Sequence, residues 1–466
     1  NIWFIILNSN LILPIIFIFL FILFLIFNQP INKFKKKQNY AIIFLLTILF
    51  YLILFNFRTN IPWVDDWEWI ENLQTEETST WRWLNQPTNI HNIFFTKIIF
   101  LFVDNYLNQN FEFFNFFSIF LIFLISLLVL SKEDKINSLG LSLIIILIFS
   151  GKQFANFTQS SNIVWSLCFF YIILIYKFID QQNIKSVIIN STIIFIAPLT
   201  FGLGYVIPIY IIFFIYFHNI YKNFKILYIF LSIAGFLISV TMPRLFFGEI
   251  GYPLSGYDYL DLGLIINYKF YITFFGVLSN VYLPWIDGFA YIGFIVGSAQ
   301  FLIIILTLFK NYRSNSYEDF SDFLSHNILI SIGLIFAFLV SLTRNDLQTV
   351  VAARYSVGSI LFQIGFWKLV FENFTFIKII NRFSLSLIIL YVLFLGIFSP
   401  YHGIHWQANR YAENTKILNC YNSNDEKICN KLAYKLLFYG GDWYDFNTFE
   451  KQIRVLKRDK KSFFNS

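Results

Sequence analysis

Long apolar runs, separated by short polar segments, recur along most of this 466-residue chain. The hydrocarbon core of a bilayer is roughly 30 Å thick, and a helix needs about 20 predominantly apolar residues to cross it. Hydrophobic residues make up 57% of the chain and charged residues only 13%, which excludes an ordinary soluble protein. The sequence therefore predicts an all-α polytopic membrane protein.

The runs and the loops between them predict about 12 transmembrane helices. The first run, which ends at Phe27, is too long for a signal-peptide core and has no small-residue cleavage site, so we expect a span there. The other expected spans cover residues 40–57, 112–130, 137–150, 163–178, 187–200, 203–219, 226–241, 289–309, 326–342, 354–372 and 383–399. We expect a transmembrane domain over 1–399 and a small external tail over 400–466.

Charge in the loops predicts the orientation, because short basic loops mark the cytoplasmic side. The basic clusters lie at 33–37, 132–135, 177–185, 222–225, 310–313 and 378–382. Residues 58–92 instead carry six acidic residues against Arg58 and Arg82. The alternation holds if 93–107 and 265–283 are juxtamembrane helices in the external interface. We therefore expect external loops at 58–111 and 242–288, and we attribute the net charge of +7 to cytoplasmic anchoring rather than to nucleic-acid binding.

Two adjacent carboxylates, Asp65 and Asp66, lie in the segment Ile61–Ile70, which follows the apolar run Tyr40–Phe57. Trp63, Trp67 and Trp69 all lie within three residues of this pair. Indole rings favour the membrane–water interface. Carboxylates concentrated at that depth predict a general base, or a site for a divalent cation such as Mg²⁺ or Mn²⁺. The alternative interpretation is a solvated span end.

Two further external segments carry polar residues of interest. Lys152, Gln153 and Gln159 lie in the amide-rich loop 151–162, whose composition suits sugar hydroxyls but equally suits any loop. Cys420 and Cys429 lie nine residues apart in the tail, where an oxidising compartment would let them form a disulfide. No nucleotide-binding loop, Rossmann glycine pattern or zinc spacing occurs, which disfavours a nucleotide-linked donor.

The order of the motifs resembles a known class of enzymes. Asp65-Asp66-Trp67 is followed by Asn89-Ile-His-Asn-Ile-Phe-Phe-Thr-Lys97, then by an expected interfacial helix and a second span. This arrangement resembles the GT-C class of integral-membrane glycosyltransferases, in which bacterial relatives often show Asp-Asp-Trp, an Asn-Glu-His-Arg stretch and a later Arg. Asn89 and His91 match that stretch and Lys97 can stand for the later Arg, whereas positions 90 and 92 depart from it. Ala352-Ala-Arg-Tyr-Ser356 resembles the Arg-Tyr found at the external start of a late span.

The resemblance implies a chemistry. The donor would be a polyprenyl-phosphate-linked sugar, and the acceptor a glycan, a lipid or a protein, on the external face of the cytoplasmic membrane. Asp65 or Asp66 would accept the acceptor's proton or hold the divalent cation. Arg354, with Lys97 and Arg344 behind it, would bind the leaving phosphate as its charge rises. The expected substrate contacts also include His91, Tyr355, Gln153 and Gln159.

Two other classes compete with this interpretation. O-antigen polymerases and ligases also act on lipid-linked glycans, but they usually rely on external Arg and His in a large late loop. Here the loop at 343–353 is small, and the prominent motif is early and acidic. A transporter or flippase of lipid-linked glycans should carry ionisable residues inside its spans and often has internal repeats. Few such charges and no evident repeat occur in this chain, which favours chemistry at the interface.

Overall fold

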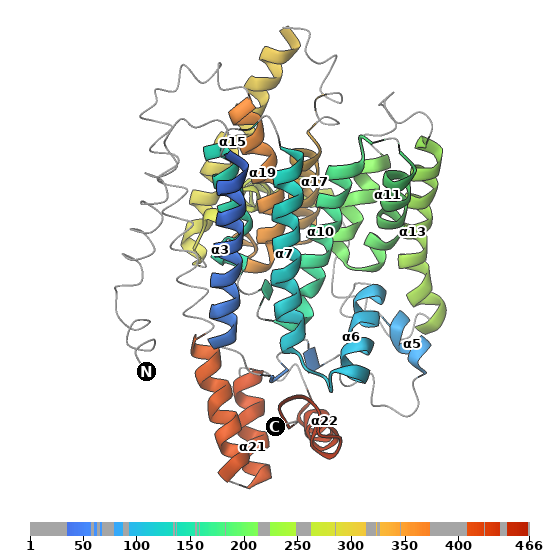
Figure 1. Ribbon diagram of the computed structural model, residues 1–466, viewed down its shortest axis with the longest axis vertical. Helices are drawn as coiled ribbons and strands as arrows, with labels where there is room; N and C mark the ends of the chain where they lie inside the picture. Colours follow the sequence, from blue (N-terminus) through green and yellow to red (C-terminus); the bar gives the residue numbers. More distant parts are fainter. Residues whose placement is uncertain are drawn as a thin grey trace. The chain divides into compact units, whose positions relative to one another are not determined.

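The computed structural model describes nineteen parts of the chain. They are residues 35–56, 60–62, 66–67, 79–86, 93–133, 136, 138–153, 156–157, 159–181, 183–212, 224–247, 262–284, 286–313, 323, 327–344, 346–372, 408–423, 425–438 and 445–464. Within these ranges the regular structure is helical and contains no strands (Figure 1). This confirms the predicted all-helical class. The expected spans ending at Phe27 and covering 383–399 lie outside the described residues.

Four of the described helices are long and apolar enough to cross a bilayer: Asn39–Asn56, Glu112–Lys132, Ser160–Phe178 and Asp287–Phe309. They contain 18 to 23 residues, which corresponds to roughly 27–35 Å at about 1.5 Å per residue. Each coincides with a predicted span, so the membrane character of the chain is confirmed to this extent. The total of about 12 spans stays a prediction.

Other apolar helices are shorter. α8 (Ser138–Ile148) and α14 (Tyr268–Leu278) each contain 11 residues, and α6 (Phe94–Tyr106) contains 13. At about 1.5 Å per residue these helices extend for only roughly 17–20 Å. The lengths of α6 and α14 suit the juxtamembrane helices expected near 93–107 and 265–283, whereas α8 is shorter than the span expected at 137–150.

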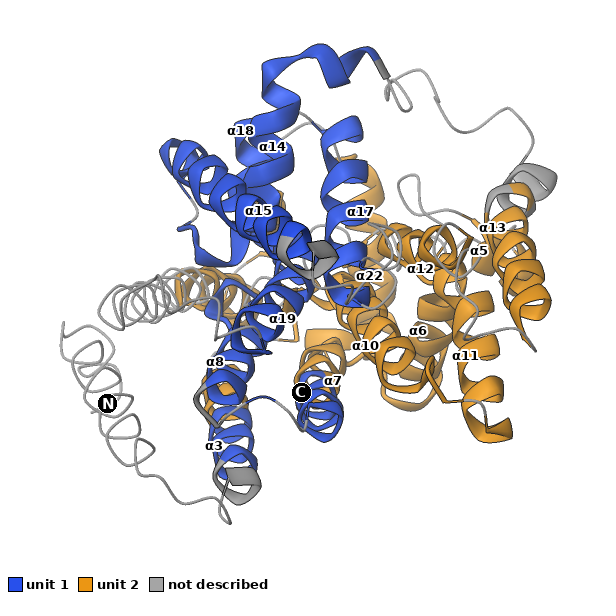
Figure 2. Ribbon diagram, turned by 90° about the horizontal axis from the view of Figure 1, so that it is seen from above, with its two compact units in different colours: residues 1–48, 122–154, 257–404 blue, residues 49–121, 155–256, 405–466 orange. Residues whose placement is uncertain are grey.

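The chain forms two compact units, coloured blue and orange in Figure 2. Unit 1 comprises residues 1–48, 122–154 and 257–404, and unit 2 comprises 49–121, 155–256 and 405–466. Two long helices, α3 (Lys35–Asn56) and α7 (Glu112–Lys132), contribute residues to both. The segment expected to form a separate tail from residue 400 lies almost wholly in unit 2.

Unit 1 is built from closely packed helices. Its main members are α8, α14, α15 (Ala290–Arg313), α17 (Ile328–Thr343) and α19 (Ser356–Glu372). α15 passes so near α14 at Gly297 that a Cβ there would lie 1.9 Å from the Phe275 carbonyl oxygen. Small residues allow this close backbone approach in apolar surroundings.

A buried polar network also ties unit 1 together. Gln300 and Gln363 exchange amide hydrogen bonds of 2.8 and 2.9 Å between α15 and α19. The Tyr282 hydroxyl donates to Gln363 Oε1 at 2.7 Å, and Trp367 Nε1 donates to that hydroxyl at 2.8 Å. These bonds fix the segment that follows α14, because the buried polar groups would otherwise lose their partners.

Unit 2 holds the loop helices and the tail. Its helices include α5 (Thr80–Asn85), α6, α10 (Ile163–Phe178), α11 (Ile184–Ile196) and α13 (Lys225–Phe247). The tail adds a helix over 408–423, then α21 (Glu426–Leu437) and α22 (Phe446–Arg458). α22 buries Phe449, Ile453 and Leu456 and exposes a basic face, as an amphipathic helix does.

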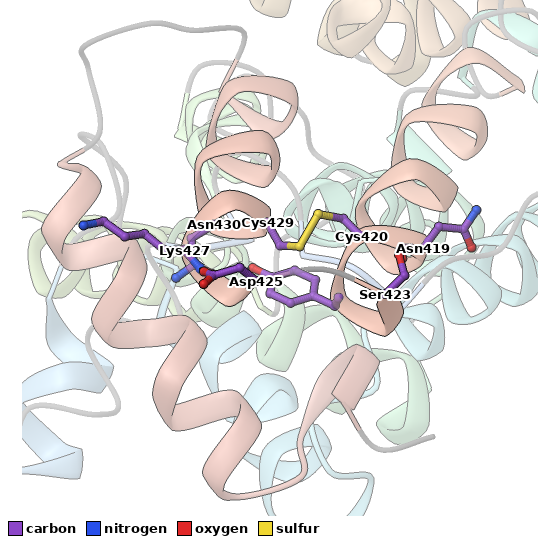
Figure 3. Close-up of a disulfide and its surroundings, with 8 residues drawn as sticks. Asn419, Cys420, Ser423, Asp425, Lys427, Cys429 and Asn430 are labelled. Atoms are coloured by element: carbon purple, nitrogen blue, oxygen red, sulfur yellow. A yellow bond between two sulfur atoms is a disulfide. The ribbon is translucent and has the colours of Figure 1, made fainter.

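The two tail cysteines are joined. Cys420 on the helix over 408–423 and Cys429 on α21 form a disulfide with a Cα–Cα distance of 5.5 Å (Figure 3). Asp425 lies in the turn between them and caps α21 by accepting a hydrogen bond of 2.7 Å from the Lys427 amide. The disulfide joins the two helices, and the cap marks the residue at which α21 begins.

Candidate functional site

Asp66 is fully buried in unit 2. Its Oδ1 accepts a hydrogen bond of 2.7 Å from the backbone amide of Ser161. Ser161 belongs to η2 (Ser160–Asn162), the 3-10 turn that leads directly into α10. Backbone amides at a helix start are free to donate, and the helix dipole there favours negative charge. The η2 turn that precedes α10 therefore holds one of the two carboxylates that the sequence singles out.

The neighbouring Trp67 anchors the same segment. Its indole Nε1 donates to the Pro62 carbonyl oxygen at 2.9 Å, and its ring lies against Phe449 of α22, with 4.8 Å between centroids. Gln452 Nε2 of α22 donates to the Trp67 carbonyl oxygen at 3.1 Å. The tail thus packs directly on Trp67.

Two residues near the end of the tail, Lys461 and Ser462, contact the backbone and side chains near Asn60 and Asn108. The Ser462 hydroxyl donates to the Asn60 carbonyl oxygen at 2.6 Å, and the Ser462 amide donates to the Asn108 carbonyl oxygen at 2.9 Å. Lys461 Nζ forms an ion pair of 2.7 Å with Asp104. The residues that follow α22 therefore bind the backbone at Asn60 and Asn108 and the Asp104 carboxylate, while α22 itself contacts Trp67.

Lys97, expected to bind phosphate, is fully buried. Its Nζ donates to the carbonyl oxygens of Trp83 at 2.7 Å and Gln86 at 2.5 Å, and lies 4.9 Å from the centroid of the Trp83 ring. These carbonyls belong to the last turn and the C-cap of α5. Lysine suits such a position, because helix C-terminal carbonyls lack partners and carry partial negative charge. The structure gives Lys97 a capping role.

Unit 1 carries the expected Arg-Tyr motif in η11 (Ala353–Tyr355), a 3-10 turn between α18 (Leu347–Val351) and α19. Tyr355 is buried and packs on Phe336, whereas Arg354 is exposed, with its guanidinium carbon 5.3 Å from the Tyr355 ring centroid. Stacking on an aromatic face suits arginine. Arg344, half-buried, is the C-cap of α17.

The turn that carries Arg354 is bound by two buried side chains. Lys152, in η1 (Gly151–Gln153), donates from Nζ to the carbonyl oxygens of Leu283 at 2.8 Å and Val351 at 2.5 Å. Asn280 Nδ2 donates to those of Val350 at 2.5 Å and Ala352 at 3.1 Å. Burial lowers the pKa of Lys152 to about 7.

The remaining expected residues serve local structure or lie elsewhere. Gln153 is buried and donates from Nε2 to the Ile148 carbonyl oxygen at 2.7 Å, at the end of α8. Gln159 donates to the Ser161 hydroxyl at 2.8 Å. Asp65 and His91 lie outside the described residues. No group of three potential metal ligands occurs among the residues that were described, so cation binding by the aspartate pair stays a prediction.

Sequence reasoning missed Gln452 and the capping roles of Lys97 and Lys152. The signal for Lys152 was its position directly after an apolar run, where a charge must find a partner. No protein-family model matches the chain, and neither a curated protein nor a solved structure matches it. The resemblance to GT-C glycosyltransferases therefore stays a prediction based on motifs.

Proposed function

We propose that this protein is a membrane glycosyltransferase, which moves a sugar from a polyprenyl-phosphate donor to an acceptor on the extracytoplasmic face. The observation that carries the proposal is the anchored Asp66 segment. A buried carboxylate bonded to the η2 turn before α10, in the segment that follows a helix long enough to span a bilayer, is costly to maintain without a use.

The two aspartates take different roles in this proposal. Asp66 is committed to the Ser161 amide and buried, which suits a residue that orients the segment. Asp65, one residue earlier, is then the general base. Its carboxylate takes the proton of the acceptor hydroxyl while the oxygen attacks the anomeric carbon. The bond from that carbon to the phosphate oxygen breaks, and the polyprenyl phosphate leaves with the electron pair, so a single displacement inverts the anomeric centre.

The leaving phosphate needs a cation that is free to reach it. Lys97 and Lys152 both direct Nζ to backbone carbonyls inside their units. Arg354 is exposed at the start of α19, and a planar guanidinium can bind a phosphate through two hydrogen bonds. We therefore assign the phosphate contact to Arg354, with Arg344 as the second candidate.

Contacts within unit 1 agree with the expected sidedness. Lys368, near the end of α19, pairs with Glu133 at 3.2 Å, and Glu133 lies in the loop expected to be cytoplasmic. The start of α19 follows the turn bound by Lys152, whose loop is expected outside. Near the end of α19, the contact is thus with a loop predicted to be cytoplasmic, and at its start the contact is with a loop predicted to be external. This agreement supports an external position for Arg354.

The test uses the full chain in proteoliposomes with an undecaprenyl-phosphate-linked labelled sugar and a membrane extract as acceptor source. Asp65→Asn should lower the transfer rate by about 100-fold or more, the usual contribution of a general base, with unfolding stability unchanged. Asp66→Asn should lower both activity and stability. The control is Asp287→Asn, an exposed carboxylate outside the proposed site.

Two outcomes would contradict the proposal. Wild-type protein that transfers no sugar from any lipid-linked donor would overturn the activity. Full transfer by Asp65→Asn and Asp66→Asn, together with loss in Arg344→Ala or Arg354→Ala, would instead favour an enzyme of the polymerase or ligase kind.

A further inference from the structure

The backbone at the end of α18 is bound by side chains from other parts of unit 1. Three consecutive carbonyls, those of Val350, Val351 and Ala352, accept hydrogen bonds from side chains distant in sequence. Carbonyls in the last turn of a helix have no partner within the helix. Asn280 donates to the carbonyls of Val350 and Ala352, and Lys152 donates to the carbonyl of Val351, which lies between them.

The same lysine reaches a second helix end. Leu283, whose carbonyl accepts the other bond from Lys152 Nζ, is the C-cap of η9 (Asn280–Tyr282). Lys152 therefore joins η1, the end of η9 and the end of α18, and Asn280 joins η9 to α18 again. A neutral amine has two N–H donors, which equals the number of carbonyls that Lys152 contacts.

Arg354 lies three residues beyond Val351. The intervening backbone is short and ordered: the Ala352 amide donates to the Gln348 carbonyl oxygen at 2.9 Å, and the Tyr355 amide donates to the Ala352 carbonyl oxygen at 3.3 Å. Fixing residues 350–352 consequently fixes the direction in which η11 leaves α18. It sets Tyr355 in the packed interior and Arg354 at the surface.

We propose that Lys152, together with Asn280, is a positioning residue for Arg354, and that it orients this guanidinium toward the phosphate of a polyprenyl-phosphate donor. The inference rests on the proposed function for the identity of the ligand. The connection from Lys152 to the turn does not depend on it. Lys152 does not contact the donor and acts only through the backbone of 350–352.

The experiment has one readout for the turn and one for the donor. Hydrogen–deuterium exchange of the full chain in nanodiscs should show faster exchange at the amides of 352–355 in Lys152→Met, because the hydrogen bond that holds the Val351 carbonyl is lost. Steady-state transfer should show a KM for the lipid-linked donor raised about tenfold, equivalent to about 1.4 kcal/mol, with kcat changed less than about threefold. Lys152→Arg, which keeps donors for both carbonyls, should restore both readouts.

The control is Lys185→Met, which removes an exposed lysine of α11 and should change neither readout. If Lys152→Met does not accumulate as folded protein, Lys152→Gln supplies the same comparison with one shorter donor. Unchanged exchange at 352–355 would overturn the positioning role whatever the activity. Faster exchange with an unchanged donor KM would overturn the link to the phosphate. A wild-type protein that transfers no sugar, with faster exchange in Lys152→Met, would overturn the proposed function and the named ligand while leaving the connection to the turn established.

Discussion

Each unit buries a lysine whose Nζ donates to the carbonyls of helix ends, but the two lysines join very different stretches of chain. In unit 2, Lys97 bonds to carbonyls 11 and 14 residues away, on the small helix α5. In unit 1, Lys152 bonds to carbonyls 131 and 199 residues away, on η9 and α18. The same chemistry therefore secures one local loop helix in unit 2 and joins three distant segments in unit 1.

Asp66 binds a helix start, whereas the two lysines bind helix ends. Its carboxylate accepts from an amide at the start of η2 and α10, where the helix dipole is positive. Unit 2 obtains its long-range tie through the tail, since Gln452 bonds to Trp67 across 385 residues. In this apolar chain, the unpaired backbone groups at helix ends stabilise buried ionisable side chains. A bond between residues close in sequence holds one loop, whereas a bond between distant residues joins separate parts of a unit.

The largest expected effect comes from the tie between Trp67 and the tail. Trp67→Ala removes a fully buried indole, its bond to Pro62 and its contact with Phe449. We expect a loss of about 3–5 kcal/mol in the free energy of unfolding, together with rapid proteolysis within 405–466. Trp81→Ala, at an exposed position, is the matched control. A tail that stays resistant to protease would show that Trp67 does not hold it.

Loss of the tail disulfide should have the next largest effect. In Cys420→Ser/Cys429→Ser the denatured chain regains the freedom of a loop closed across nine residues, worth about 2–3 kcal/mol. Differential scanning calorimetry should show a lower Tm for unit 2, and addition of reductant should lower the Tm of wild type but not of the double variant. Equal sensitivity of both proteins to reductant would contradict this expectation.

Lys97→Met tests whether that lysine caps α5 or binds a ligand. Two buried carbonyls lose a donor, so we expect about 2 kcal/mol of destabilisation and faster hydrogen exchange confined to residues near 80–97. The donor KM should stay unchanged. A raised KM with unaltered stability would return Lys97 to the phosphate site and break the parallel with Lys152.

The smallest effect, taken per pH unit, is a pH dependence specific to unit 1. Burial lowers the pKa of Lys152 from 10.5 to about 7. Between these values the unfolded chain binds more protons than the folded chain, so stability rises with pH, by up to about 1.4 kcal/mol per pH unit. Unfolding titrations from pH 7 to 10 should show this rise in wild type and in Lys185→Met, and a smaller one in Lys152→Met. An identical slope in all three proteins would contradict the shifted pKa.

Much of the helical layout was predictable from the sequence, because a long apolar run can satisfy its backbone in a membrane only as a helix. The span expected at 163–178 coincides with α10, and the one at 354–372 begins two residues before α19. The acidic segment was also recognisable from its charge and its tryptophans. The partners were not, because the bonds from Lys152 to Val351 and from Gln452 to Trp67 join residues that no local pattern relates.

The most direct test of the central claim is photo-crosslinking of the full chain in nanodiscs with a diazirine-bearing undecaprenyl phosphate, followed by peptide mapping. In the proposed function the lipid phosphate binds at the Arg354 turn of unit 1. We predict labelled peptides from residues 343–356, competed by unlabelled undecaprenyl phosphate. Labelling confined to peptides around Glu133 and Lys368, at the opposite end of α19, would contradict the account.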